Sequence, residues 1–278
     1  MAATMRATRI GARDFHWGSQ TFVMGILNVT PDSFSGDGLR DVAGAVARAL
    51  QMEQDGADLI DVGGESTRPE TWRGPGLGAE EELERVLPVV ERVAAAVRIP
   101  VSIDTYKSVV AQRALAAGAS LVNDVFGLRR DPGMAGTVAQ AGVPVVLMHN
   151  HPGSDDQEDI VGEIAAGLRQ SVALAQAAGI PEERIILDPG IGFGKNRRQN
   201  LQIIHRLAEL RALGFPLLIG PSRKSFIGKT LDLPVEERLE GTAAAVALGI
   251  AGGADVVRVH EVRAMVRVAR MSDAILRA

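Results

Sequence analysis

The sequence contains no cysteine, which excludes disulfide bonds, thiolate metal sites and a cysteine nucleophile. It also has no apolar run near the roughly 20 residues that a membrane-spanning helix needs. The first 18 residues lack the apolar core of a signal peptide. A net charge of −4 gives no general attraction to nucleic acids or anionic membranes. We therefore expect a soluble, cytoplasmic protein.

Lysine is scarce as well, because the 30 basic residues include only Lys107, Lys195, Lys224 and Lys229. Each lysine is therefore more informative than usual. The 46% of hydrophobic residues and 23% of charged residues predict a globular core and argue against disorder. A chain of 278 residues can form one large α/β barrel.

Eight short apolar runs recur along the chain and are typical of parallel strands covered on both faces. They span residues 22–29, 58–64, 100–104, 120–125, 143–149, 184–190, 216–222 and 255–260. Segments rich in Ala, Leu, Arg and Glu lie between them, such as 41–56, 79–97 and 235–253, and predict helices. Eight βα units favour a (β/α)8 barrel of the TIM type over an open sheet. We expect one domain over 1–278, with an N-terminal hairpin in 1–20 that closes the lower end and a barrel in 21–278.

Polar side chains follow all eight predicted strands, at the ends where (β/α)8 barrels carry their chemistry. A barrel without a site would put small or apolar residues at several of these positions, because buried carboxylates are costly unless they are paired. A single such Asp can be a helix N-cap, but the whole set predicts a ligand site. The set comprises Asn28, Asp32, Asp61, Glu65, Asp104, Asn123, His149, Asp188, Ser222, Lys224, Arg258 and His260.

The residue types at these ends describe the ligand. Asp104, Asn123 and Asp188 offer acceptors from three strands, which suits a planar heterocycle that displays NH and NH2 groups. Lys224 adds a donor for a ring carbonyl. Flat contacts on the ring are expected from three further side chains, namely Met148, Phe193 and Arg258.

A second group of donors indicates a phosphate or pyrophosphate site. Arg258, His260, Asn28 and Arg68 come from strand ends and loops that face each other in a barrel, and the last two strands are a common anion site. The amide oxygen of Asn28 can also bind Mg²⁺, which is usually held by phosphate oxygens and few protein ligands.

At this point the motifs resemble those of the dihydropteroate synthase family over nearly the whole chain. They are GILNVTPDSFS (25–35), DVGGESTRP (61–69), SIDT (102–105), VNDV (122–125), MH (148–149), DPGIGFGK (188–195), SRKSF (222–226) and RVH (258–260). Eight motifs in order, each at the end of a predicted strand, make a specific match.

The resemblance implies a role for each matched position. It places the pterin ring at Asp104, Asn123, Asp188 and Lys224, and the pyrophosphate at Asn28, Arg68, Arg258 and His260, with Mg²⁺ at Asn28. It places p-aminobenzoate near Phe34, Thr67, Pro69 and Ser225. It further implies a homodimer, for which the apolar residues of the last helix are candidates: Val262, Met265, Val266, Val268 and Ala269.

The chemistry implied is attack of a neutral arylamine on the pterin methylene as pyrophosphate leaves. No strong general base is needed, which agrees with the absence of an obvious Ser–His or Cys–His pair. Lys224, Arg258 and His260 are the expected catalytic groups, together with Asp32, which would stabilise the developing cation. The long polar segment 28–38 would close over the reacting groups and exclude water.

Several positions depart from the family's usual pattern: SFSGDG at 33–38, Glu70 and Trp72 after STRP, MHN at 148–150, and RVHE at 258–261. The first two changes affect the expected p-aminobenzoate and sulfonamide contacts more than the pterin pocket. Two alternatives remain open. One is a pterin-binding methyltransferase domain that acts on a methyl-folate, and the other is a paralogue that binds pterin without catalysis.

Overall fold

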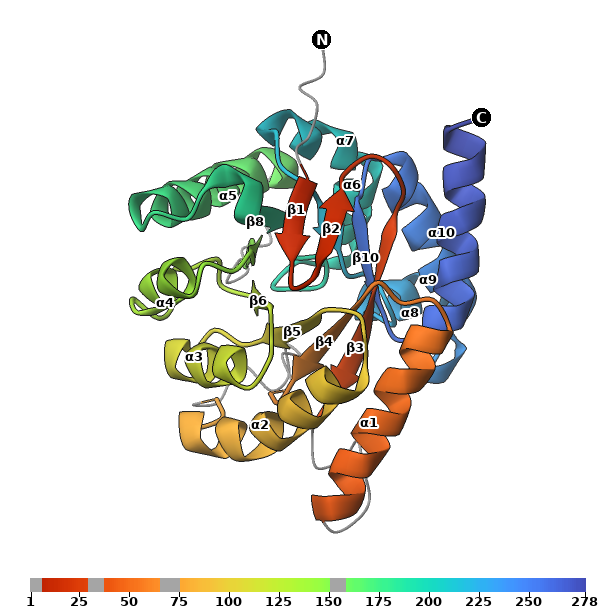
Figure 1. Ribbon diagram of the computed structural model, residues 1–278. Helices are drawn as coiled ribbons and strands as arrows, with labels where there is room; N and C mark the ends of the chain where they lie inside the picture. Colours follow the sequence, from red (N-terminus) through yellow and green to blue (C-terminus); the bar gives the residue numbers. More distant parts are fainter. Residues whose placement is uncertain (1–6, 30–37, 66–75, 151–158) are drawn as a thin grey trace.

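The fold is a closed barrel of eight parallel strands, described by a computed structural model for residues 7–29, 38–65, 76–150 and 159–278, without the side chains of 38–41. The strands are β3 (Phe22–Asn28), β4 (Leu59–Gly63), β5 (Val101–Asp104), β6 (Leu121–Asp124), β7 (Val145–Met148), β8 (Ile185–Asp188), β9 (Leu218–Ile219) and β10 (Val256–Val259). They pair in the order β8-β7-β6-β5-β4-β3-β10-β9. A parallel bridge between Leu187 and Leu217 closes the ring (Figure 1). The predicted (β/α)8 barrel is confirmed.

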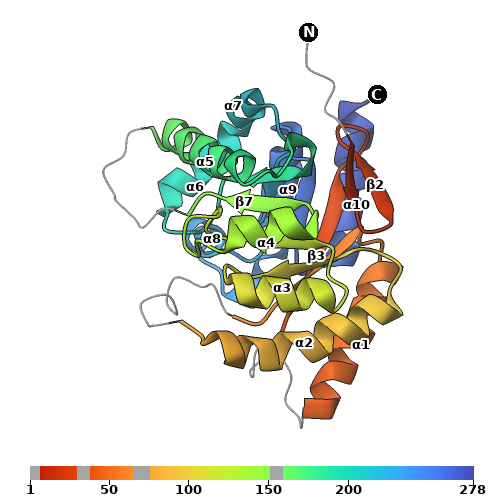
Figure 2. The same cartoon turned by 60° about the vertical axis from the view of Figure 1, so that its left-hand side comes forward.

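Helices surround the strands and cover the outer face of the barrel (Figures 1 and 2). They are α1 (Gly38–Gln54), α2 (Ala79–Ala96), α3 (Ser108–Ala116), α4 (Met134–Ala141), α5 (Ile160–Ala177), α6 (Arg197–His205), α7 (Leu207–Leu210), α8 (Ser225–Leu231), α9 (Leu239–Ala251) and α10 (Val262–Leu276). Short 3₁₀ turns are η2 (Glu182–Arg184), η3 (Arg211–Leu213) and η4 (Val235–Glu237). No helix of the described residues is long and apolar enough to cross a membrane.

Successive side chains of each strand point alternately into the barrel and outward toward the helices. Outward residues such as Val23 and Leu27 belong to the large core between strands and helices. Inward residues at the lower end form a separate apolar cluster from the start of the strands: Phe22, Met24, Leu59, Leu121, Val146, Ile186, Leu218 and Val256. Two to four positions further along β3, β4, β6, β8 and β10, the same inward face becomes polar, at Asn28, Asp61, Asn123, Asp188 and Arg258.

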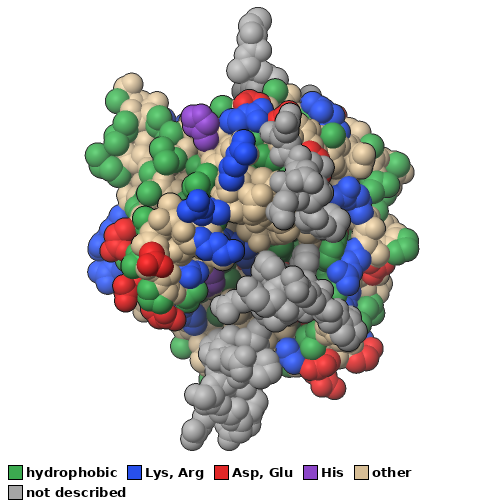
Figure 3. All heavy atoms as spheres, turned by 180° about the vertical axis from the view of Figure 1, so that it is seen from behind, with side chains coloured by type: hydrophobic (Ala, Val, Ile, Leu, Met, Phe, Trp, Pro, Cys, Tyr) green, Lys and Arg blue, Asp and Glu red, His purple; other side chains and the backbone are tan. Residues whose placement is uncertain are grey.

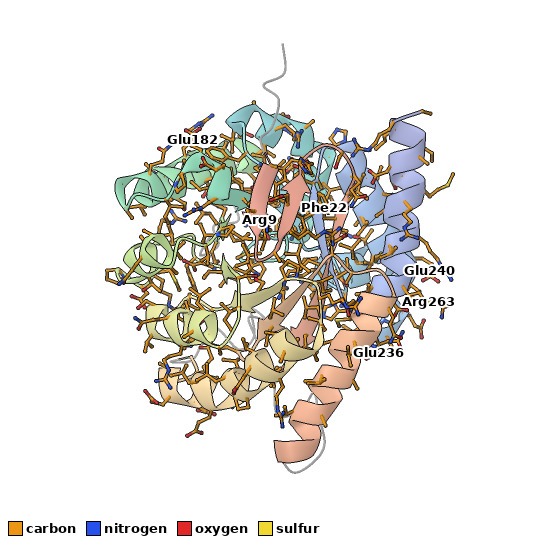
Figure 4. All side chains as sticks on the ribbon, in the orientation of Figure 1. Arg9, Phe22, Glu182, Glu236, Glu240 and Arg263 are labelled. Carbon is orange, nitrogen blue, oxygen red and sulfur yellow. The ribbon has the colours of Figure 1, made fainter. Side chains whose placement is uncertain are left out.

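The lower end is closed by the predicted N-terminal hairpin, which consists of β1 (Ala7–Ile10) and β2 (Arg13–His16). Ile10, Phe15 and Trp17 join the apolar cluster inside the barrel. The rings of Phe15 and Phe22 lie 4.8 Å apart between centroids. Figure 4 shows Phe22 next to the hairpin, whereas Glu236, Glu240 and Arg263 lie at the outer edge of the molecule.

Two sequence-based expectations about the C-terminal half are wrong. The segment 235–253 is not one helix, because the turn η4 and the helix α9 are separated at Arg238. The guanidinium of Arg238 donates to the carbonyl oxygens of Leu233 and Arg223, which fastens the chain at that point. The apolar residues of α10 that were expected to form a dimer surface, Val262, Met265, Val266 and Ala269, are buried in this chain's own core, and Val268 packs against it.

Candidate active site

Arg258 lies at the centre of a buried charge network at the C-terminal end of the barrel. Its Nε donates to Oδ2 of Asp61 at 2.6 Å, and its Nη2 donates to Oδ2 of Asp104 at 2.7 Å. Asn123 donates its side-chain amide to the same oxygen of Asp61 at 2.9 Å. The four side chains come from β4, β5, β6 and β10, so the barrel itself fixes the network.

Two buried carboxylate oxygens of the network have no hydrogen-bond donor among the described residues. Oδ1 of Asp61 and Oδ1 of Asp104 accept no hydrogen bond from the described residues. Buried oxygens of this kind are rare in folded proteins unless a ligand or water meets them. Asn123 donates one of its two amide N–H groups to Asp61, and its amide oxygen can accept from a ligand.

Burial sets the protonation of the carboxylates at this site. It raises the pKa of Asp104 to about 7, opposed by Arg258 and reinforced by Asp61. It also raises the pKa of Asp188 to about 6, opposed by the Gly190 N–H and by Lys224. Burial works against the charge of Arg258, but Asp61 and Asp104 outweigh it and raise its pKa. The site therefore keeps carboxylates that change charge near neutral pH.

Beside this network the barrel mouth holds a hollow. Its lining contains the predicted residues Asn123, Met148, Asp188, Phe193, Lys224 and Arg258, together with Val125, Ile191 and Gly220. The Lys224 ammonium lies 3.9 Å from the centre of the Phe193 ring. Asp188 accepts from the Gly190 N–H at 2.7 Å. The hollow thus combines acceptors, a cation and flat apolar contacts, as a planar polar ring requires.

His260 is held by Ser222 through two contacts. The Ser222 Oγ lies 2.9 Å from His260 Nδ1, and the backbone N–H of His260 donates to the same oxygen at 3.2 Å. Because Oγ already accepts the backbone bond, its hydroxyl can donate to Nδ1, which leaves the proton of a neutral imidazole on Nε2.

Asn28 lies on the inward face of β3, paired with Gly63, and is exposed at the end of the strand.

A second charged cluster lies beside the network at the ends of β4 and β5. The Lys107 ammonium contacts Glu65 Oε2 at 2.6 Å and also the carboxylate of Glu82, which is 1% exposed. Oε1 of Glu65 accepts from the Leu77 N–H at 3.1 Å. Lys107, one of the four lysines, is therefore paired with two acidic partners. On the face opposite the hairpin, Lys and Arg side chains gather around the centre (Figure 3).

The structure brings six of the predicted residues together around one hollow: Asn123, Met148, Asp188, Phe193, Lys224 and Arg258. The predicted residue Asp104 is joined to them through its ion pair with Arg258. Ser225 follows Lys224 as the first residue of α8. The predicted residues Asp32, Phe34, Thr67, Arg68 and Pro69 lie outside the described residues. The described part of the chain contains no group of three or more His, Cys, Asp or Glu side chains that could hold a metal.

Sequence reasoning noted Asp61 as a strand-end carboxylate but gave it no role. Its contacts show that it holds both Arg258 and Asn123, which depends on the register of four strands. The apolar lining by Val125, Ile191 and Gly220 was also missed. The alternation along β6 gave a signal for Val125, since it lies two residues after Asn123 on the same face.

The whole sequence fits a described family. Residues 24–260 match the family model "Pterin binding enzyme", which covers most of the chain and all of the barrel strands except the first two residues of β3. The fold and the site therefore define a pterin-binding enzyme built on a (β/α)8 barrel.

Curated and solved relatives narrow this class. The dihydropteroate synthase of Bacillus subtilis is 49% identical over 258 residues, which cover 92% of this chain and 89% of the relative. The Clostridium difficile dihydropteroate synthase solved with pteroic acid is 47% identical, with a TM-score of 0.91 and coverage of 95% and 100%. The Xanthomonas albilineans dihydropteroate synthase solved with 4-aminobenzoic acid is 41% identical, with a TM-score of 0.91 and coverage of 98% and 100%. The chain belongs to the dihydropteroate synthase family and is a transferase of folate synthesis.

Proposed function

We propose that the chain condenses 6-hydroxymethyl-7,8-dihydropterin pyrophosphate with p-aminobenzoate to give 7,8-dihydropteroate and pyrophosphate. The observation that carries the proposal is the buried Asp61–Arg258–Asp104 network beside Asp188 and Lys224. Pteroic acid, the ligand of one solved relative, joins a pterin to p-aminobenzoate as the product of such a condensation does, and 4-aminobenzoic acid, the ligand of another, is one of the two substrates.

In this proposal the pterin ring lies in the hollow. Asp188, the Asn123 amide oxygen and the remaining oxygen of Asp104 accept from the NH and NH2 groups of the ring, and Lys224 donates to its carbonyl. Met148 and Phe193 contact its faces and Arg258 stacks on it. The support is that every described member of this set lines the hollow or joins the network at its edge.

The pyrophosphate lies toward Arg258, His260 and Asn28, with Arg68 as a further donor. A neutral His260 that carries its proton on Nε2 donates to a phosphate oxygen, and the Ser222 hydroxyl holds it in that tautomer. Stabilising the leaving group is the harder part of the reaction, because the attacking arylamine is already neutral at pH 7. Bond breaking to pyrophosphate therefore runs ahead of amine attack.

The amine is received by the segments that follow β3 and β4. Asp32 stabilises positive charge on the pterin methylene, and Phe34, Thr67, Pro69 and Ser225 contact p-aminobenzoate. Closure of these segments would exclude the water that competes with the amine.

Mg²⁺ suits the donors at this site only as an ion shared with the substrate. Asn28 is one exposed amide at the strand end, which matches an ion with few protein ligands and several phosphate ligands. When bound, the ion neutralises charge on the leaving pyrophosphate. Asn28 would be its protein ligand.

The chain is further proposed to act as a single domain over 1–278, in the cytoplasm, as a homodimer. Since the buried residues of α10 cannot pair, the candidate contact is the exposed apolar set on α9 and α10: Leu248, Met271, Ile275 and Leu276. These two helices pack against each other at one side of the barrel (Figure 1).

The test is pyrophosphate release from the dihydropterin pyrophosphate with Mg²⁺, with and without p-aminobenzoate. Release that requires the amine and yields dihydropteroate supports the synthase. Release without coupling to the amine would mean that the second site does not work. Binding of pterin with no release would instead favour the methyltransferase or the non-catalytic paralogue.

A further inference from the structure

Lys195 is a lysine that the proposed reaction does not use, although it lies in the loop after β8 that borders the pterin hollow. Its Nζ donates to three carbonyl oxygens, those of His149 at 3.1 Å, Gly190 at 2.9 Å and Phe193 at 3.1 Å. Burial lowers the pKa of Lys195 to about 7, opposed by Asp188, so below that pH the group is an ammonium whose three protons match the three acceptors. The acceptors belong to two loops, which follow β7 and β8.

The loop between Asp188 and Lys195 has a backbone that few sequences could adopt. Gly190, Gly192 and Gly194 have φ values of 69°, 82° and 64°, in the left-handed region that favours glycine. A Cβ on Gly190 would lie 2.0 Å from the His149 carbonyl oxygen. A Cβ on Gly192 would lie 2.7 Å from Cδ of Lys224. The loop is therefore built for close approach to both the β7 loop and Lys224.

Side chains outside the hollow fix this conformation. The Gly192 N–H donates to Oδ1 of Asn200 at 2.6 Å, and the Asn200 amide donates to the carbonyls of Lys195 and Asn196. Asn200 is 2% exposed. Neither Lys195 nor Asn200 lines the hollow. What they hold in place is Phe193, whose ring lies beneath the Lys224 ammonium.

We propose that Lys195 is a positioning residue that sets the affinity for the pterin ring through the shape of the 189–195 loop, without touching the ring. The inference rests on the proposed function, because it assumes that the hollow binds pterin. Loss of the ammonium takes a donor from three backbone carbonyls, of which that of Gly190 keeps the Phe193 N–H, and the loop then no longer holds Phe193 and Lys224 in their places relative to Asp188. Only pterin binding depends on these places, so p-aminobenzoate recognition is left intact.

The first experiment compares Lys195→Met with the wild type by calorimetric titration of the pterin substrate and by steady-state kinetics. A methionine keeps the apolar stem and removes the ammonium. We expect the Kd and the KM for pterin to rise about 10- to 100-fold, the range for hydrogen bonds to a charged group. The KM for p-aminobenzoate should change less than about threefold. Lys229→Met, on the exposed face of α8, is the matched control and should behave as the wild type.

The second experiment restores the ammonium. Because the chain has no cysteine, Lys195→Cys creates one alkylation site, at a partly exposed position. Reaction with 2-bromoethylamine gives a side chain of lysine-like length with an ammonium, whereas a propyl halide gives a neutral side chain of similar size. Pterin affinity should recover with the aminoethyl group and not with the propyl group. Equal affinities for the two adducts would overturn the inference.

Asn200→Ala tests the same loop from its other side, whether or not Lys195→Met folds. We expect a rise in the pterin Kd of about fivefold, with the KM for p-aminobenzoate unchanged. Folded Lys195→Met and Asn200→Ala proteins with wild-type pterin affinity would contradict the positioning role. A wild-type protein that binds no pterin would overturn the proposed function, and this inference with it.

Discussion

The two ends of the barrel are made from the same strands but differ in almost every physical property. At the lower end the inward residues are apolar and pack against Ile10, Phe15 and Trp17 of the hairpin. At the upper end the inward residues include Asp61, Asp104, Asn123, Asp188 and Arg258, and two buried carboxylate oxygens accept no bond from the described residues. Two to four residues along a strand separate the two environments.

This contrast indicates a division of labour within one set of strands. Apolar burial at the lower end stabilises the barrel, at about 25 cal/mol for each Å² removed from water. Buried charge at the upper end costs stability unless every partner is present. We therefore expect the lower end to provide most of the stability of the barrel. The polar side chains of the upper end serve ligand binding.

The largest expected effect is that of Arg258→Met. The change leaves Asp61 and Asp104 buried without their shared cation, so the network no longer orders the pocket. We expect kcat/KM for the dihydropterin pyrophosphate to fall at least 10³-fold, about 4 kcal/mol. Arg263→Met, at the outer edge in Figure 4, is the matched control. Steady-state kinetics would decide, and a loss below about tenfold would remove Arg258 from the centre of the site.

A substitution at the lower end should instead lower stability and leave catalysis unchanged. Phe15 is fully buried, stacks with Trp17 and makes a tilted ring contact with Phe22. Phe15→Ala should lower the free energy of unfolding by about 3 to 5 kcal/mol in urea denaturation. The kcat and KM per folded molecule should stay near wild-type values. If catalysis fell while the protein remained fully folded, the two ends would not be separable.

A smaller effect on activity is expected from Ser222→Ala. This substitution distinguishes two parts of the upper end, the pyrophosphate side at His260 and the pterin pocket. The change removes the hydroxyl contact to Nδ1 of His260 and the acceptor of its backbone N–H. We expect kcat/KM for the dihydropterin pyrophosphate to fall about tenfold. Affinity for a pterin that lacks pyrophosphate should be unchanged. Equal losses for both ligands would place His260 in the pterin pocket instead of at the leaving group.

Much of this architecture could be predicted from the sequence because eight apolar runs and their polar ends are local patterns. The order of the strands and the side of the barrel that carries the site follow from them. The role of Asp61 could not be predicted, because it depends on the register that brings Arg258 of β10 and Asn123 of β6 to one oxygen. The three hydrogen bonds of Lys195 to backbone carbonyls could not be predicted, because every residue has a backbone carbonyl and the sequence does not show which of them will accept. The apolar face of α10 was misassigned because periodicity shows that a face is buried but not against what.

The central claim is that buried charge at the upper end lowers the stability of the fold but is needed to bind the ligand. The substitution Asp188→Asn tests this claim most directly. Because burial raises the folded-state pKa of Asp188 from 3.8 to about 6, the native state binds more protons than the unfolded chain between these values. The stability of the wild type therefore falls as the pH rises through this window, and the cost remains fully present at pH 8.

The measurement is the free energy of unfolding and the pterin Kd of the wild type and Asp188→Asn, both at pH 8. The account predicts opposite signs: the variant unfolds with a free energy on the order of 1 to 3 kcal/mol higher, and it binds pterin at least 100-fold more weakly. A variant that loses stability while keeping its pterin affinity would contradict the account.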